Sequence, residues 1–158
     1  MKILGIDPGT ATTGFGLIEK SGAKLTKLDA GVISTPKIEH MQYRLKMLYD
    51  DLSQLVKTHQ PDYIAVEKLF FTNNITTAMS VSQARGIVLL VAAQNNIELA
   101  EYTPLQVKMS VTGYGQAEKK QVQEMVKKIL KLSVVPKPDD AADALAIAIC
   151  HSATIKRK

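Results

Sequence analysis

The sequence predicts a single α/β domain that contains a mixed five-stranded sheet with helices on both faces. Three observations support this fold class. The first third of the chain contains three strand-like segments joined by tight turns, which favours an antiparallel meander. Beyond residue 40, helical and strand-like segments alternate, a pattern typical of parallel strands joined by helical crossovers. With 158 residues and 46% hydrophobic content, the chain has the size of one domain with one core.

The three strands of the meander are expected at Lys2–Ile6, Gly14–Glu19 and Lys24–Ser34. A cluster of Gly and Thr residues separates the first two, and Ser21-Gly22 separates the second pair. From Met41 the apolar residues recur at helical spacing, up to a helix end before Pro61; they are Met41, Leu45, Leu48, Leu52, Leu55 and Val56.

The remaining elements alternate between strand and helix. We expect strands at Tyr63–Val66 and Glu98–Tyr102, and helices at Thr76–Gln94, Glu118–Leu130 and about Asp139–Ala153. This is the element order of ribonuclease H-like folds. Because no repeat or linker interrupts it, residues 1–158 should form one domain, with residues 155–158 as a frayed basic tail.

Composition narrows the class of protein only slightly. Lys and Arg total 20 against 15 acids, a modest excess typical of proteins that meet polyanions but weak evidence by itself. The single cysteine, Cys150, excludes an internal disulfide and is expected to be an inert buried thiol. The longest apolar run, Ile87–Ala93, is too short to span a bilayer and the start of the chain has no signal segment, so we expect a soluble cytoplasmic protein.

Acidic residues follow two of the expected strands. Asp7 comes directly after the first strand, and Glu67 closes the apolar segment Tyr63–Val66. Alternatively, Asp7 forms the turn with Pro8 and Gly9, and Glu67 emerges into water at the rim of the sheet. If the two strands are neighbours, the two carboxylates meet. Burial of such unpaired charges is costly unless a partner or a metal ion compensates.

Three more acids open the last helix. Asp140 and Asp143 are three residues apart and so share one helical face, while the alanines between them permit close packing. Acids in a first helical turn are also favoured by capping and by the helix dipole, an explanation that suits Asp139 best, as the N-cap. Taken together, carboxylates from two strand ends and one helix converge on one edge of the expected sheet. Oxygen ligands of this kind favour Mg²⁺ or Mn²⁺ over zinc, and two such ions roughly 4 Å apart can support phosphodiester hydrolysis.

Four segments carry a family resemblance: Gly5-Ile6-Asp7-Pro8-Gly9, Val66-Glu67-Lys68-Leu69-Phe70, Gln83-Ala84-Arg85-Gly86 and Asp140-Ala141-Ala142-Asp143-Ala144-Leu145-Ala146. In order and spacing they resemble the bacterial RuvC Holliday-junction resolvases, over essentially the whole chain. The resemblance implies a ribonuclease H-like homodimer that nicks four-way DNA junctions in recombination and repair. It also implies paired symmetric nicks that leave 5′-phosphate and 3′-hydroxyl ends, and cooperation with the branch-migration proteins RuvA and RuvB.

The same resemblance implies which residues act. Catalysis and the binding of two Mg²⁺ ions, or of Mn²⁺ in their place, fall to Asp7, Glu67, Asp140 and Asp143. Asp139 lies outside this set, although an acid there could also reach the face of Asp143.

The resemblance also implies DNA contacts. Phe70 is expected to stack on bases near the junction centre, with core packing as the alternative. Lys108 and Lys119 are expected to contact backbone phosphate, with Lys120 as a further candidate; an ordinary solvated surface role is the alternative for each. The segment Gly113-Tyr114-Gly115 is expected to be a flexible loop that brings this region to DNA.

Two other functions remain open from the residues alone. Asp7-Pro8-Gly9-Thr10 followed by Thr13-Gly14 resembles the first phosphate loop of actin-like and sugar-kinase-like proteins, but 158 residues hold only one of the two lobes that these need. A nuclease of the same fold that acts on RNA, of the YqgF type, is the second alternative. The expected helix Thr76–Gln94 suits either a dimer interface or an internal crossover.

Overall fold

Across residues 1–68 and 75–155, which the computed structural model describes, the chain forms one five-stranded sheet and five helices. The strands are β1 (Lys2–Asp7), β2 (Thr12–Ser21), β3 (Lys24–Ser34), β4 (Tyr63–Glu67) and β5 (Glu98–Tyr102). The helices are α1 (Met41–His59), α2 (Ile75–Gln94), α3 (Pro104–Thr112), α4 (Lys119–Ile129) and α5 (Asp139–Thr154).

The sheet has the order β3-β2-β1-β4-β5. Strands β1, β2 and β3 pair antiparallel, which confirms the predicted meander. Strand β4 pairs parallel with both β1 and β5, which confirms the predicted crossovers. Because Ile6 is level with Val66 in the β1–β4 register, the last residues of the two strands, Asp7 and Glu67, lie at the same edge of the sheet.

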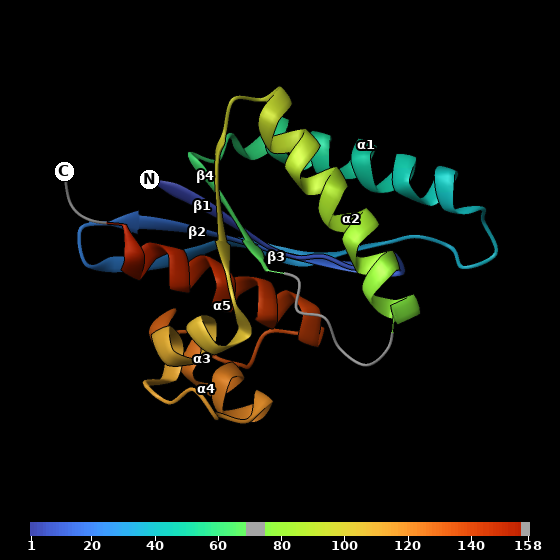
Figure 1. Ribbon diagram of the computed structural model, residues 1–158. Coiled ribbons are helices and arrows are strands. Elements are labelled where there is room, and N and C mark those ends of the chain that lie inside the picture. The colour runs from blue at the N-terminus through green and yellow to red at the C-terminus, as the bar shows by residue number, and fades with distance from the viewer. Residues whose placement is uncertain (69–74, 156–158) are drawn as a thin grey trace.

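Helices cover both faces of the sheet, as predicted (Figure 1). Helices α1 and α2 lie on one face, where they bury Leu48, Leu52 and Val88 against β1 and β4. Helix α5 lies directly on the other face, and α3 and α4 pack against α5 as an outer layer (Figure 1). The sheet therefore separates two apolar clusters, and the edge where β1 and β4 end stays accessible.

Three glycines let α5 lie close to the sheet. A Cβ on Gly5 would stand 2.0 Å from the carbonyl oxygen of Ala144, and one on Gly14 would stand 2.1 Å from that of Asp140. Gly16, opposite Gly5 in the register, faces the backbone of Leu145 in the same way. No larger residue fits at these positions without moving the helix.

Helix α3 is an element that the strand and helix periodicities missed. Its apolar residues Leu105, Val107, Met109 and Val111 fall at every second position, the spacing of a strand. The end signals are nevertheless those of a helix. The Thr103 side chain caps the amide of Gln106, and Gly113 ends the helix in the left-handed conformation.

Helix α2 is apolar enough to cross a bilayer by length and composition alone, with a mean hydropathy of 1.4 over an 18-residue window. The sequence analysis considered only the uninterrupted apolar run Ile87–Ala93. It overlooked the longer apolar helix because polar residues interrupt its apolar residues. In the structure, one side of α2 packs over the sheet through Ala84, Val88, Val91 and Ala92. Those contacts are typical of the core helix of a globular domain.

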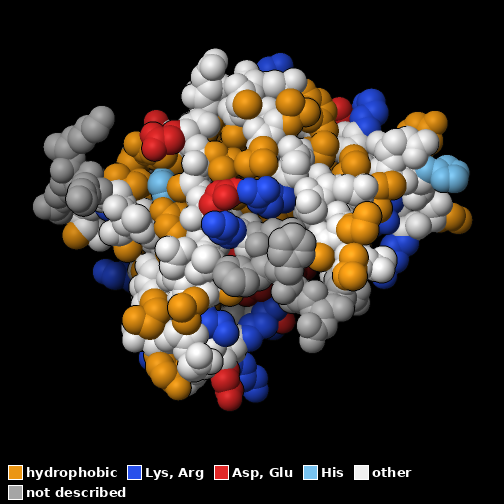
Figure 2. All heavy atoms as spheres, in the orientation of Figure 1, with side chains coloured by type: hydrophobic (Ala, Val, Ile, Leu, Met, Phe, Trp, Pro, Cys, Tyr) orange, Lys and Arg blue, Asp and Glu red, His pale blue; other side chains and the backbone are white. Residues whose placement is uncertain are grey.

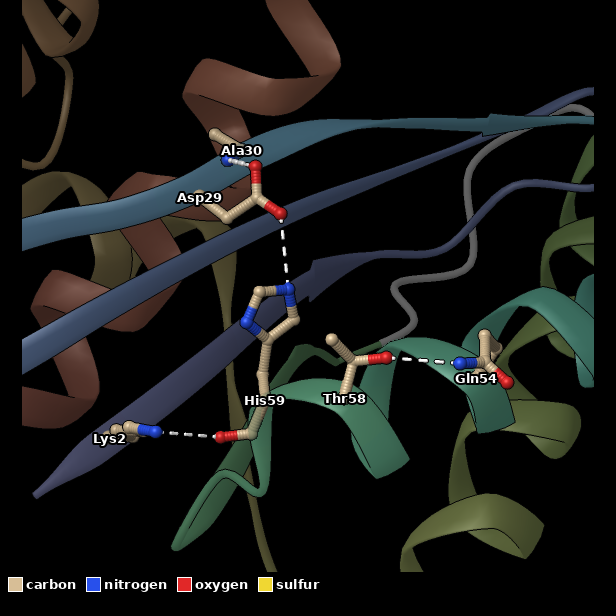
Figure 3. A network of polar contacts seen from close by, with 6 residues as sticks. All are labelled: Lys2, Asp29, Ala30, Gln54, Thr58 and His59. Carbon is tan, nitrogen blue, oxygen red and sulfur yellow. Dashed lines mark hydrogen bonds and ion pairs between the residues drawn. The ribbon is translucent and has the colours of Figure 1, made fainter.

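A polar network fixes the C-terminal end of α1 on the sheet, away from the edge where β1 ends (Figure 3). The His59 ring lies 3.2 Å from the Asp29 carboxylate of β3, and the Lys2 ammonium donates to the carbonyl oxygen of His59 at 3.0 Å. Gln54 donates to the Thr58 hydroxyl one turn apart on the same helix.

Of the predicted tail, residues 155–158, the structure describes Ile155. Ile155, its first residue, packs against the core beneath α5, and its amide donates to the carbonyl oxygen of His151. An isoleucine at the helix end can still bury apolar surface, and the frayed tail stays a prediction. Residues 156–158 lie outside the described part of the chain.

Candidate active site

The alternation of side chains along β1 and β4 points two acids toward α5. In β1, Leu4 and Ile6 belong to the apolar cluster under α1 and α2, so Asp7 falls on the face of α5. In β4, Val66 also belongs to the α1 and α2 cluster, so Glu67 falls on the α5 face as well. The two strand-end carboxylates are therefore neighbours on one face, as the sequence predicts.

Helix α5 brings its own acids to the same place. Asp7, Asp140 and Asp143 each offer a carboxylate oxygen, and these oxygens all lie within 4.8 Å of one another. Glu67 lies outside this compact group but lines the same cavity as Asp7 and Asp143. The structure thus gathers all four acids at one edge of the sheet, three of them tightly.

The cavity has a volume of about 280 Å³ and a mixed lining. Its charged walls are Asp7, Glu67, Asp143, Lys108 and Lys119, and its apolar walls are Pro104, Val107, Val122, Ala146 and Ile147. The sequence analysis missed Pro104 and Val107 because they belong to α3, a helix that the periodicities did not predict. The caps of α3 were the signal that could have located Pro104 and Val107.

Burial and mutual repulsion change the acidity of the cluster. Burial, followed by the charges of Glu67, Asp143 and Asp140, raises the pKa of Asp7 to about 7. Burial is also the first cause of the raised pKa values of Glu67 and Asp143. The protein thus holds at one point several carboxylates that resist full ionisation unless positive charge is added.

Two lysines supply part of that positive charge. The Lys119 ammonium at the start of α4 lies 2.9 Å from a carboxylate oxygen of Asp143, and this hydrogen bond is the main cause of its raised pKa. Lys108 on α3 lines the cavity. Burial raises the pKa of Glu67, and the charge of Lys108 opposes part of that rise. Both lysines therefore stand where the sequence analysis expected them, at the acidic cluster.

Asp139 takes a different position from the one expected. Pro138 is the N-cap of α5 and Asp139 is the first helical residue, so Asp139 does not cap the helix. Its carboxylate pairs with Lys137 at 3.1 Å and lies 3.8 Å from Lys119. The Lys137 contact lowers the pKa of Asp139, which is ordinary behaviour for an exposed ion pair.

The other expected DNA contacts fall into two groups. Phe70 and its neighbour Phe71 lie outside the described residues. Lys120 lines a second groove on the other side of α4, separate from the cavity of the four acids. In the segment expected to be a flexible loop, the Gly113 amide donates to the carbonyl oxygen of Met109 and the Tyr114 amide donates to the Thr112 hydroxyl.

The motif that contains Arg85 has a structural part in this architecture. The Arg85 guanidinium forms an ion pair with Glu101, which joins α2 to the edge strand β5. Glu101 is level with Val66 in the β4–β5 register, one residue before Glu67, so the pair braces the strand that carries Glu67.

The donor set suits a hard divalent cation. The ligands that the cluster offers are all carboxylate oxygens. Burial, followed by repulsion from the neighbouring acids, raises the pKa values of Asp7 and Asp143. A bound cation would relieve that repulsion, so the residues fit a metal site.

Comparison with known proteins agrees with this geometry. The family described as crossover junction endodeoxyribonuclease RuvC matches the chain over residues 3–151. The chain belongs to the RuvC family. A crossover junction endodeoxyribonuclease RuvC of Desulfitobacterium hafniense strain DCB-2 is 56% identical over 155 residues, which cover 98% of this chain and 94% of that relative.

Solved structures show the same fold. The Thermus thermophilus RuvC in complex with a Holliday junction substrate matches with a TM-score of 0.91 and 35% identity, over 96% of this chain and 93% of that chain. The yeast mitochondrial Holliday junction resolvase Ydc2 matches with a TM-score of 0.65 and 15% identity, over 94% and 77% of the two chains, which shows a shared fold.

Membership of the RuvC family makes this chain an endodeoxyribonuclease of a metal-dependent class, whose members are soluble proteins that act on DNA. It favours the junction-nuclease interpretation over the nucleotide-binding and RNA-nuclease alternatives. It also agrees with the packing of α2 as a core helix.

Proposed function

We propose that this chain, acting as one nuclease domain, resolves four-way DNA junctions by symmetric paired nicks that leave 5′-phosphate and 3′-hydroxyl ends. The observation that carries the proposal is the cluster of Asp7, Asp140 and Asp143, whose oxygens lie within 4.8 Å of one another beside Glu67 and two lysines. The complex of the Thermus thermophilus relative with a Holliday junction supports the choice of substrate.

Asp7, Glu67, Asp140 and Asp143 would hold the metal, which we propose to be two Mg²⁺ ions, with Mn²⁺ as a substitute. When bound, such ions lower the pKa of a water nucleophile and offset negative charge on the leaving oxygen. Asp7 is central to the set because the other three acids all surround it and raise its pKa.

The protein itself supplies position and charge. Lys108 and Lys119 line the cavity and offer ammonium groups to the phosphate that is cut. Lys119 is held by Asp143, so a metal that neutralises Asp143 would free the lysine for the DNA backbone. The apolar walls from α3 and α5 restrict water around the reacting phosphodiester.

Further DNA contacts complete the proposal. Phe70 follows the strand that carries Glu67 by three residues, and an aromatic ring there would stack on bases opened at the junction. Lys120 would contact backbone phosphate outside the cavity. We also propose a cytoplasmic location and cooperation with RuvA and RuvB, which the family resemblance implies.

The test of the function is the nicking of a four-way junction and of its linear duplex arms, in Mg²⁺ or in EDTA. Wild-type protein should make paired nicks at the junction in Mg²⁺ only. Asp7→Asn should abolish cleavage while junction binding stays, because the change removes the central carboxylate without disturbing the lysines. Loss of binding together with cleavage would argue against Asp7 as a metal ligand.

We further propose that the active form is a homodimer joined through α2. Ile75, Met79 and Leu90 are 73%, 63% and 46% exposed, and with Gly86 they fall within one narrow sector of the helix. Figure 2 shows apolar side chains at the surface where Figure 1 places α2. A Cβ on Gly86 would meet nothing within 4 Å, so a second helix can approach closely there. A second copy of the chain is the occupant that matches the two-fold symmetry of a junction.

The double variant Met79→Lys with Leu90→Lys should convert the dimer to a monomer, because it places two charges on the apolar sector. Light scattering after size-exclusion chromatography measures the mass. Ile38→Lys is the matched control, since Ile38 is 93% exposed and lies outside α2. A double variant that stays dimeric would exclude this surface as the interface.

A further inference from the structure

A second groove lies on the side of α4 that faces away from the four acids. Its volume is about 400 Å³, and its lining comes from the end of α3, the turn after it, and α4: Thr112, Tyr114, Ala117, Lys120, Gln121, Glu124, Met125 and Lys128. Ala117 forms a buried floor, and Tyr114 forms a wall that is 59% exposed. The groove thus combines apolar surface and the exposed ring of Tyr114 with two cationic side chains, Lys120 and Lys128.

The aromatic wall is held in place by its own turn. Gly113 adopts a left-handed conformation with a φ of 76°, and its amide donates to the carbonyl oxygen of Met109 at 2.9 Å. The Tyr114 amide donates to the hydroxyl of Thr112 at 3.1 Å. On the far side of the turn, a Cβ on Gly115 would stand 2.5 Å from the Leu105 side chain. The backbone that carries the Tyr114 ring is thus ordered before a flat ligand stacks on the ring.

The charges of the groove favour an anion. Lys120 and Lys128 are eight residues apart on α4, about 12 Å along the helix axis, which is the rise of three to four nucleotides of one strand. Neither lysine forms an ion pair among the residues that the structure describes. Glu124 stands between them and reduces the net positive charge without pairing closely with either.

The groove and the candidate active site lie on two sides of the start of α4. Lys119 and Val122 line the cavity of the four acids, while their neighbours Lys120 and Gln121 line the groove. Adjacent residues of one helix turn thus face two sites, and a chain of phosphates that leaves the cavity over the start of α4 reaches the groove directly. Figure 2 shows basic side chains beside apolar ones over the region where Figure 1 places α3 and α4.

We infer that this groove binds the DNA strand next to the cleaved phosphodiester, with a base or sugar against Tyr114 and backbone phosphates at Lys120 and Lys128. The inference deepens the proposed function and rests on it. A nucleic acid is favoured over a protein partner because a stacking ring with cations at nucleotide spacing suits successive nucleotides. Through this contact, the groove sets how firmly a junction arm is held.

The experiment measures junction affinity by fluorescence anisotropy in Ca²⁺ over a range of salt, with cleavage measured separately in Mg²⁺. Tyr114→Ala should weaken binding about tenfold, while Tyr114→Phe keeps the ring and should bind as wild type does. Lys120→Gln with Lys128→Gln should lower the slope of log affinity against log salt by about 1.8. Glu124→Gln should tighten binding, because it removes the acid that opposes phosphate.

The matched control is Lys24→Gln with Lys27→Gln, which removes the same charge from exposed positions on β3, at the end of the strand away from the acids. This pair should change the slope far less. In multiple-turnover cleavage the groove variants should raise the Michaelis constant by a larger factor than they lower kcat. Unchanged affinity in the groove variants, or an equal effect of the control pair, would overturn the inference. Failure of the wild type to make paired nicks would instead count against the proposed function.

Discussion

At the scale of the residue, the carboxyl group of Asp7 has a position that suits metal binding but lowers the stability of the fold. It is buried, and it faces Glu67, Asp140 and Asp143 across short distances. Only Lys119 and Lys108 offset these charges within the cavity that the structure describes. Folding therefore assembles an arrangement of acids that repel one another, and a site of this kind is stable only when cations share it.

The pH dependence of stability in EDTA tests this arrangement. The folded-state pKa of Asp7, about 7, lies above its ordinary value of 3.8. The folded protein therefore keeps a proton that the unfolded chain releases, and stability is lost as the pH rises from about 4 through 7. A three-unit shift corresponds to about 4 kcal/mol at most. Urea unfolding should show Asp7→Asn more stable than wild type at pH 8, with a smaller difference at pH 5.

The pKa of His151 also affects how stability depends on pH. Burial lowers its pKa, so its contribution has the opposite sign and is lost as the pH falls below about 6.5. Both proteins contain His151, and its effect cancels in their difference. Mg²⁺ at pH 8 should stabilise wild type more than Asp7→Asn. A variant that is less stable than wild type at pH 8 in EDTA would contradict the repulsion account.

At the scale of the element, the distance between α5 and the sheet decides where two of the acids lie. Gly5, Gly14 and Gly16 offer the helix a surface without side chains. The alanines of α5, among them Ala141, Ala144 and Ala148, are buried on the helix side. Small residues on both sides permit close packing, and this brings Asp140 and Asp143 to Asp7.

Gly14→Ala tests the role of this close packing. The added methyl group would stand 2.1 Å from the carbonyl oxygen of Asp140, so the start of α5 must move. We expect a loss of about 1–3 kcal/mol in the free energy of unfolding, together with a lower nicking rate.

The control for Gly14→Ala is Gly31→Ala in the same sheet. Its new methyl group meets only the Phe15 ring, at 3.0 Å, and a side chain can adjust more easily than a backbone. Urea unfolding and single-turnover nicking measure both variants. Equal cleavage by the two would show that the position of α5 does not control the site.

At the scale of the whole molecule, the described residues of one chain form one cluster of acids on one edge of the sheet, whereas resolution of a junction requires two strands to be cut. Two copies related by a two-fold axis would supply the second site in matching orientation. The sheet lies between the proposed cleavage site and the proposed dimer surface. The acids lie toward α5, while the exposed apolar sector belongs to α2 on the opposite face.

A supercoiled plasmid that extrudes a four-way cruciform tests this division. Paired nicks by a dimer convert the plasmid to a linear form, and a single nick releases an open circle. The double variant Met79→Lys with Leu90→Lys should yield open circles, because its carboxylates are intact but its sites are uncoupled. Ile38→Lys should still yield linear DNA. Linear product from a monomeric double variant would refute the need for a dimer.

The sequence by itself determined the order and type of most elements, because apolar periodicity is a local property. Strand β5 matched its predicted bounds, and β3 did as well. The four acids were also visible, since each stands at the end of a strand or the start of a helix. Helix α3 was not predicted because its apolar residues alternate as in a strand. Only its capping residues indicate a helix.

Only the tertiary structure decided which charges face one another. Asp140 and Asp139 are adjacent acids in the sequence, yet Asp140 joins Asp7 and Asp143 while Asp139 pairs with Lys137. In the same way Lys119 faces the acids and Lys120 faces the other groove. Adjacent residues on a helix differ by about 100° in direction, and the packing of α4 and α5 against their neighbours determines what each direction meets.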